Sequence, residues 1–275
     1  MRPLEEFLSG PGPMARLRLS RVRGSSPREA GCEMYVSEGA LHGTIGGGQL
    51  EHRAIAAARA LLARGDLAEV LDLPLGPEID QCCGGRVEVS IFRMGATDRH
   101  AALARAAEEA AALPVVQIHG AGHVGRSLAH LLQHLPVRCT MIDSRAEELA
   151  LCTARVEKAL TPLPEFEIAT APAGSAFVVL THDHALDFLC ASAALRRGDA
   201  RYVGLIGSAT KREKFRRFAR NECDGLSDES LTCPIGAQGS RDKRPEVIAA
   251  FVVAEVLTAL TLQQGAARPM AFAAE

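Results

Sequence analysis

Hydrophobic and polar residues alternate along much of the first third of the chain. The stretch "ARLRLSRV" after Met14 and the stretch "RVEVSIF" from Arg86 each put every second apolar side chain on one face. The stretch "CEMYVSEGALHGTI" from Cys32 divides into two such runs around a Ser-Glu-Gly turn. Because a period of two is typical of half-buried strands, we predict a largely antiparallel sheet in this region.

A helical pattern interrupts these strands. The sequence "QLEHRAIAAARALLARG" predicts a helix that ends at Gly65, since glycine commonly terminates a helix. We therefore predict a mixed α+β domain over residues 1–98. The alanine-rich segment 99–113 predicts a helical connector that stops before Pro114.

The pattern changes from residue 114 onward. Continuous apolar strands are predicted at 115–118, 138–143, 175–181 and 201–207, and helices at 123–135, 184–198, 209–221 and 244–260. Buried strands that alternate with helices indicate a parallel, doubly wound sheet. The predicted fold class is thus α/β, with a Rossmann-like domain over residues 114–275 after the mixed domain.

Charge and composition exclude several classes of protein. The formal net charge is −2, which gives no electrostatic reason to expect binding to nucleic acid or to an anionic membrane. No apolar run has the length of a signal peptide core or a bilayer span, so we expect a cytoplasmic protein. The eight cysteines include no C-x-x-C pair, which argues against a zinc site and favours free thiols.

A glycine fingerprint opens the second half. Gly120, Gly122 and Gly125 follow a predicted strand and open a predicted helix, and Asp143 ends the next strand. This context favours a dinucleotide, with its pyrophosphate at the helix N-terminus beside His123 and its ribose on Asp143. The alternatives are a fold that binds no ligand or one that binds another phosphorylated molecule.

Polar side chains also follow a later strand of this half. Thr181 ends the strand predicted at 175–181, and His182, Asp183, His184 and Asp187 follow it. Ligands bind at the carboxyl ends of parallel strands, so these side chains are expected to face the same crevice as the glycine loop. They could bind a metal, transfer protons, hydrogen-bond a phosphate, or only cap the next helix.

The first half carries two glycine-rich signals. Gly46, Gly47, Gly48 and Gln49 join a strand to a helix, where free amides can hold an anion or simply form a turn. In "QCCGG", the thiols of Cys82 and Cys83 precede Gly84. Thiolates bind soft metals and act as nucleophiles, whereas the alternative is a pair of small, half-buried residues.

Seven motifs occur together in one order, and their combination resembles a known family. They are "GSSPREAGCEMYV", "GTIGGGQLE", "QCCGGRVEV", "GAGHVGRSLA", "THDHALD", "YVGLIGSATKREKF" and "PIGAQGSRDKRPEVIA". In this respect the chain resembles the XdhC/CoxI family over about residues 18–260.

The resemblance implies a function. Members of this family are accessory proteins for the maturation of molybdenum hydroxylases such as xanthine dehydrogenase. It implies a chaperone, not an enzyme, that binds and protects the molybdenum cofactor (molybdopterin). It further implies cooperation with a cysteine desulfurase in sulfuration, delivery to the xanthine dehydrogenase large subunit, and a homodimer.

By the same resemblance, Cys83 and then Cys82 are the candidates to contact molybdenum, with the glycine-rich loops holding the pterin and its phosphate. NAD(P) remains an alternative ligand, and an NAD(P)-dependent oxidoreductase remains the alternative function. That reading needs a general acid or base, for which His182 and His184 are the candidates. A third possible function is a regulatory module that binds a nucleotide and catalyses no reaction, but this function gives no role to "CCGG".

Overall fold

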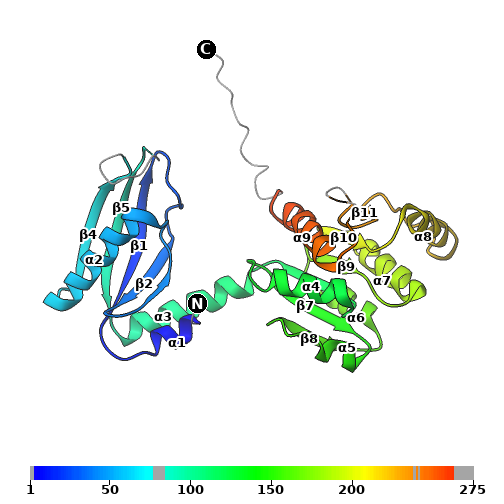
Figure 1. Ribbon diagram of the computed structural model, residues 1–275, viewed down its shortest axis with the longest axis horizontal. Helices are drawn as coiled ribbons and strands as arrows, with labels where there is room; N and C mark the ends of the chain where they lie inside the picture. The colour runs from blue at the N-terminus through cyan, green and yellow to red at the C-terminus, as the bar shows by residue number, and fades with distance from the viewer. Residues whose placement is uncertain (1–2, 77–83, 238–239, 241, 263–275) are drawn as a thin grey trace, which may run out of the picture. The chain divides into compact units, whose positions relative to one another are not determined.

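The computed structural model describes residues 3–76, 84–237, 240 and 242–262. The chain divides into two compact units, Met1–Glu109 and Ala110–Glu275. Helix α3 (Ala96–Ala111) spans this division, so it begins three residues before the connector predicted from the sequence and ends two residues earlier. Figure 1 shows the elements of each unit.

The first unit is built on an antiparallel sheet. Its strands lie in the order β3-β2-β1-β5-β4. Their bounds are β1 Met14–Arg23, β2 Glu33–Ser37, β3 Leu41–Gly43, β4 Ala68–Pro74 and β5 Arg86–Met94. The β2–β3 hairpin and the strands at β1 and β5 confirm the alternating patterns in the sequence. Strand β4 was not predicted, because its residues are half-exposed at the sheet edge and form no apolar stripe.

Helices cover both faces of this sheet. Helix α2 (Gly48–Arg64) lies over one face of the sheet (Figure 1). Its buried side chains pack with apolar side chains of β1, β2 and β5. It ends at Gly65 in the left-handed conformation, with φ of 80°, which confirms the predicted stop. On the opposite face, α1 (Leu4–Leu8) and α3 form a smaller apolar cluster with Met14, Tyr35 and Met94.

The second unit contains a six-stranded parallel sheet in the order β11-β10-β9-β6-β7-β8. The bounds are β6 Val115–His119, β7 Arg138–Asp143, β8 Glu157–Leu160, β9 Ala176–Val179, β10 Tyr202–Leu205 and β11 Leu231–Thr232. Read from β8, this is the doubly wound order 3-2-1-4-5-6 of Rossmann folds. The predicted fold class is therefore confirmed.

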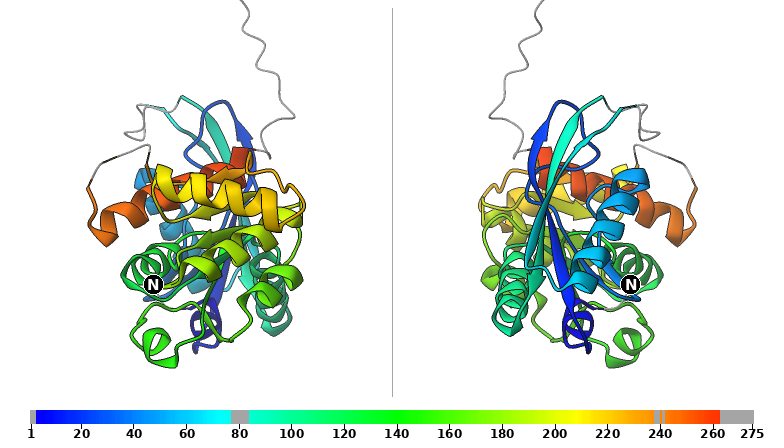
Figure 2. Two further views of the ribbon diagram at one scale, coloured as in Figure 1. Left: turned by 90° about the vertical axis from the view of Figure 1, so that its right-hand side faces the viewer. Right: turned by 90° about the vertical axis from the view of Figure 1, so that its left-hand side faces the viewer.

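Strand β9 shows how the sheet is covered on two sides. Ala176 and Val178 pack with α4 (His123–Leu132) and α9 (Pro245–Thr261), whereas Phe177 and Val179 pack with α7 (His184–Arg196) and α8 (Ala209–Glu222). Because successive side chains of a strand point to opposite faces, these helix pairs lie on opposite sides of the sheet (Figure 2).

Three shorter features complete the second unit. Helices α5 (Ala146–Ala150) and α6 (Pro164–Thr170) are too short to show a clear sequence period. Helix α4 ends at Leu132, three residues earlier than predicted, because the turn residues that follow lead into Pro136. Within the described part of the chain, every helix is too short or too polar to cross a lipid bilayer.

Candidate functional site

The carboxyl ends of β6 and β9 form the topological switch point of the second sheet. These strands are paired neighbours whose following connections run in opposite directions. Gly120 follows β6 with φ of +128°, and a Cβ atom there would lie 2.3 Å from the carbonyl oxygen of Leu180. The glycine loop and the segment that begins at Thr181 are therefore in contact through their backbones. That the side chains after Thr181 share one crevice with the glycine loop stays a prediction.

The three fingerprint glycines have different roles in this loop. A Cβ atom at Gly125 would lie 2.0 Å from the carbonyl oxygen of Gly120, so the packing of α4 against the loop requires glycine. Gly122 has an ordinary φ of −66°, and a Cβ there would meet nothing within 4 Å. Helix α4 has no side-chain N-cap, and the exposed His123 occupies its first position. Gly122 thus leaves open space at a helix N-terminus, as an anion site requires.

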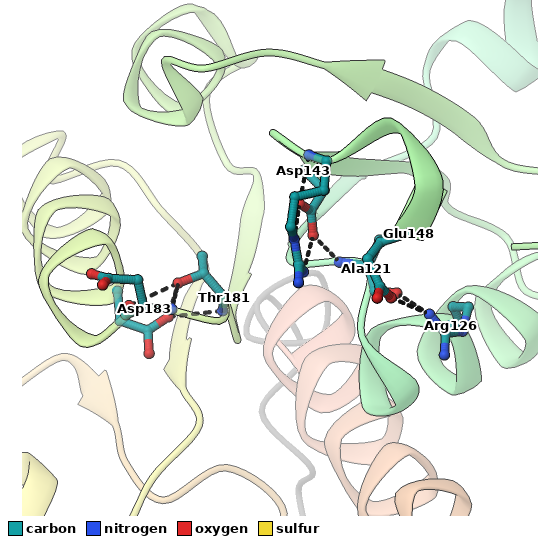
Figure 3. Close-up of polar contacts among 8 residues, drawn as sticks. Ala121, Arg126, Asp143, Glu148, Thr181 and Asp183 are labelled. Atoms are coloured by element: carbon teal, nitrogen blue, oxygen red, sulfur yellow. Dashed lines mark hydrogen bonds and ion pairs between the residues drawn. The ribbon is translucent and has the colours of Figure 1, made fainter. Parts of the chain in front are cut away.

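The loop is held in place by charged side chains on both sides. The guanidinium of Arg126 donates to the carbonyl oxygen of Ala121 and to the carboxylate of Glu148, each at 2.6 Å. Figure 3 shows this ion pair beside Ala121. These two bonds stabilise the loop conformation from within the protein.

Asp143 is already engaged within the protein. Its carboxylate accepts hydrogen bonds from the Ala121 amide at 2.7 Å and from the amide and guanidinium of Arg145 at 2.9–3.0 Å (Figure 3). Burial alone would raise the pKa of Asp143, but these hydrogen bonds hold the pKa below its ordinary value. A ribose diol would have to compete with Arg145 for this carboxylate.

The polar segment after β9 performs two tasks. Asp183 caps α7 by accepting hydrogen bonds from the amides of Ala185 and Leu186 at 2.7 and 2.9 Å. These bonds lower the pKa of Asp183. The helix-capping interpretation therefore describes Asp183, while His182 and His184 are exposed and line a neighbouring cleft.

The cleft lies between the segments that follow β9 and β10 and has a volume of about 540 Å³. Its floor is an ion pair between Asp187 and Lys211, whose side chains are 2 % and 11 % exposed. Asp187 also accepts from the amide and the hydroxyl of Thr181, both at 2.8 Å. The remaining polar lining is basic or neutral: His182, His184, Ser208, Thr210 and Lys214.

Sequence reasoning singled out Asp187 but missed Lys211 and Lys214. The signal for the two lysines lay in the motif "ATKREKF", which opens a helix directly after a strand. Ser208 caps α8 through the amide of Lys211, and no acidic residue lies in the first turn of that helix. Lysines near a helix N-terminus oppose the helix dipole, and here the ion pair with Asp187 offsets the charge of Lys211.

In the first unit, the three consecutive glycines form an anion-binding nest that is already filled. Their φ angles are +132°, +79° and +60° for Gly46, Gly47 and Gly48. One carboxylate oxygen of Glu51 accepts from the amides of Ile45, Gly46 and Gly47 at 3.0, 3.2 and 2.8 Å, and from the hydroxyl of Thr44. Burial acts to raise the pKa of Glu51, but these bonds lower it overall. Gln49 is exposed in the first turn of α2.

The structure brings both glycine-rich signals of this unit to one segment, residues 24–28. A Cβ atom at Gly46 would lie 3.2 Å from the Cβ of Pro27. A Cβ at Gly85 would lie 2.0 Å from the carbonyl oxygen of Ser25, and Gly84 has φ of +67°. Both glycines of "CCGG" are thus required by the local backbone. Cys82 and Cys83 lie outside the described residues.

No group of three or more His, Cys, Asp and Glu side chains is arranged for a metal ion among the residues that the structure describes. The predicted site residues therefore fall into a glycine loop with Asp143, a basic cleft with His182 and His184, and a separate glycine nest in the first unit.

Comparisons with known proteins place both units in one family. Residues 116–256, about half of the chain, match the model of the XdhC Rossmann domain, and residues 8–72 match the model of the XdhC and CoxI family. A structure from Bacillus halodurans, described as a xanthine dehydrogenase, is similar over 98 % of both chains, with a TM-score of 0.80 and 18 % identity. This likeness shows a common fold. No protein with a curated description matches the sequence. The chain belongs to the XdhC and CoxI family.

Proposed function

We propose that this protein is a maturation factor for a xanthine dehydrogenase that binds the molybdenum cofactor of that enzyme as cargo. The observation that carries the proposal is the match of both units, in chain order, to the two family models. The description of the Bacillus halodurans structure as a xanthine dehydrogenase supports a link to the same enzyme. In this role the protein protects the cofactor, supports its sulfuration with a cysteine desulfurase, and delivers it to the large subunit, acting as a homodimer.

The basic cleft of the second unit supports the binding of an anionic cargo. The cofactor ends in a phosphate, and Lys214, Ser208 and the N-terminus of α8 offer donors at one side of a cleft large enough for a small molecule. The buried pair of Asp187 and Lys211 is neutral as a unit and fixes the position of the lysine. In the first unit, the nest at Gly46–Gly48 holds Glu51, so we assign the phosphate to the cleft.

Neighbouring groups would orient the cargo without chemical change. The hydroxyl of Thr181 is held by Asp187, and Phe188 and Ile206 supply apolar walls for a ring system. His182 and His184 stand exposed at the rim, where they can hydrogen-bond a bound molecule. The cleft thus offers both apolar walls for the pterin ring and polar donors for the phosphate.

One observation favours the alternative function of an NAD(P)-dependent oxidoreductase. The fingerprint glycines lie at the switch point of a sheet with the dinucleotide-binding strand order, and the N-terminus of α4 has no side-chain cap. Against it, Asp143 is saturated by Arg145 and Ala121. Titration with NADH and NADPH separates the two functions, because the alternative requires saturable binding with hydride transfer to a metabolite.

The proposed function is tested by activation of a xanthine dehydrogenase apoprotein. We expect the protein purified from cells that make the cofactor to restore xanthine oxidation, and Lys214→Gln to restore less. Lys243→Gln is a matched control, because Lys243 is an exposed lysine outside the cleft. Equal activation by a preparation from cells that cannot make the cofactor would contradict the proposal.

A further inference from the structure

In addition to the basic cleft of the second unit, the first unit contains a cavity of about 390 Å³ on the sheet face opposite α2. Its floor is formed by side chains of β1, β2 and β3, and α3 forms one wall. It involves none of the residues of the basic cleft, and no predicted site residue lines it. The motif "GSSPREAGCEMYV" supplies much of the lining, although neither the glycine loops nor the cleft explain that motif.

Two arginines in this cavity have no anionic partner. Throughout residues 3–76, 84–237, 240 and 242–262, the guanidinium groups of Arg18 and Arg28 form no hydrogen bond or ion pair. The third guanidinium of the lining, that of Arg105, donates to Glu33 at 3.2 Å. The carboxylate of Glu33 also forms an ion pair with Arg16, at 3.8 Å. The acidic groups therefore leave the cavity with an excess of positive charge, even with Glu109 of α3 at its edge.

An aromatic wall with an unsatisfied polar atom faces these arginines. The ring of His42 packs between those of Phe7 and Tyr35, with centroids 5.8 and 6.4 Å away. Its Nδ1 atom is buried and has no hydrogen-bond partner among the described residues, although buried polar atoms are rarely left without one. The residue itself lines the cavity.

Local backbone geometry fixes this wall. Gly43 follows His42 with φ of +84°, and a Cβ there would lie 2.9 Å from the carbonyl oxygen of Glu33. The close approach of β3 to β2 therefore depends on glycine and sets the position of His42. Tyr35 donates its hydroxyl to Glu33 at 2.8 Å, which in turn orients the carboxylate toward Arg105.

We infer that this cavity is a binding site for a small phosphorylated molecule, with Arg18 and Arg28 holding the phosphate and His42 contacting the rest of the ligand. Guanidinium groups match the oxygens of a phosphate bidentately, and a pair of them without acidic partners is suited to a dianion. Arg28 also lies next to the glycine loop, since a Cβ atom at Gly46 would lie 3.6 Å from its Cγ. Phosphate binding would therefore order residues 24–28 against that loop.

The test uses the tyrosine of the cavity as its own reporter. The chain has two tyrosines and no tryptophan. In a Tyr202→Phe background, only Tyr35 emits, and titration with inorganic phosphate and pyrophosphate reports on this cavity alone. We expect a saturable change in emission, and at least roughly tenfold weaker binding in Arg18→Gln/Arg28→Gln, since each lost bond is to a charged group.

Controls separate this site from other effects. Arg21→Gln/Arg23→Gln makes the same charge change on exposed positions of β1 outside the cavity and should bind as the parent protein does. Lys214→Gln, in the cleft of the second unit, should also leave the Tyr35 response unchanged. If the double variant does not fold, Arg28→Gln, on an exposed loop, makes the same test. No saturable response, a response reproduced by potassium chloride of equal ionic strength, or unaltered binding in the Arg18 and Arg28 variants would overturn the inference.

Discussion

The filled glycine nest makes a quantitative prediction about the first unit. One oxygen of Glu51 accepts three backbone amides and the hydroxyl of Thr44. Hydrogen bonds to a charged group contribute about 1.5–3 kcal/mol each, against about 0.5–1.5 kcal/mol for neutral ones. Because the bonds share one acceptor, and the amides of Gly46 and Gly47 can turn to water, their contributions do not add. We expect Glu51→Gln to cost about 1–2 kcal/mol and Glu51→Ala about 2–4 kcal/mol of unfolding free energy.

The assay is urea unfolding at pH 7, followed by Tyr35 emission in the Tyr202→Phe background. In a thermal melt of a domain of about 100 residues, each kcal/mol of lost stability also lowers the melting temperature by roughly 4–8 °C. Glu38→Gln, at an exposed turn without a comparable network, is the matched control and should be neutral. A Glu51→Ala variant within about 0.5 kcal/mol of the parent protein would refute the reasoning, since that is the range of ordinary surface substitutions.

The pH dependence gives an independent check on the same carboxylate. The pKa of Glu51 is lower in the folded protein than its ordinary value of 4.5. Its contribution to stability is therefore complete above that value and is lost as the pH falls through the folded pKa. We expect the parent protein to lose stability over this acidic range more steeply than Glu51→Gln does. Identical slopes would show that the carboxylate is not held by the loop.

Three further predictions concern other residues. Gly125→Ala should lower the free energy of unfolding in urea by about 3 kcal/mol, because its Cβ would lie 2.0 Å from a backbone oxygen. Gly122→Ala should be nearly neutral, because its Cβ would meet nothing within 4 Å. Equal effects of the two substitutions would contradict this packing. Burial lowers the pKa of His119 from 6.5 to about 3, so the unfolded chain takes up a proton before the folded one does. The free energy of unfolding should therefore fall by about 1.6 kcal/mol between pH 6.5 and pH 5. His119→Asn should flatten this profile, and an unchanged profile would refute the prediction. Cys83→Ala, and less strongly Cys82→Ala, should lower the molybdenum bound per chain, and unchanged loading in both would exclude thiolate contact.

The sequence predicted the central elements of the fold because their burial is regular. Strand β6 is buried at all five positions and β5 alternates from Arg86 to Phe92, so both patterns are visible without a structure. Strands β4 and β8 lie at sheet edges with mostly exposed side chains, and an apolar period is absent there. The strand order itself depends on which long-range pairs form, and a single sequence carries little information about that.

The candidate site was predicted in part for similar reasons. The proximity of the glycine loop to Thr181 follows from the rule that carboxyl ends of parallel strands share one edge. The pairing of Asp187 with Lys211 joins two helices that are distant in sequence, and it requires β9 and β10 to be known neighbours. The hydrogen bonds from the Gly46–Gly48 loop to Glu51 depend on the backbone path of one turn. Glycine can adopt many backbone conformations, so the sequence does not determine that path.

The most direct test of the proposed cargo is the pterin and molybdenum content of the purified protein. The protein is prepared from cells that make the cofactor, oxidised to the fluorescent pterin derivative, and analysed for metal in the same sample. Binding of the cofactor predicts pterin and molybdenum in equal amounts, approaching one of each per chain and reduced in Lys214→Gln. A protein that is empty, that cannot be loaded with isolated cofactor, and that oxidises or reduces a metabolite with NAD(P) would contradict the account.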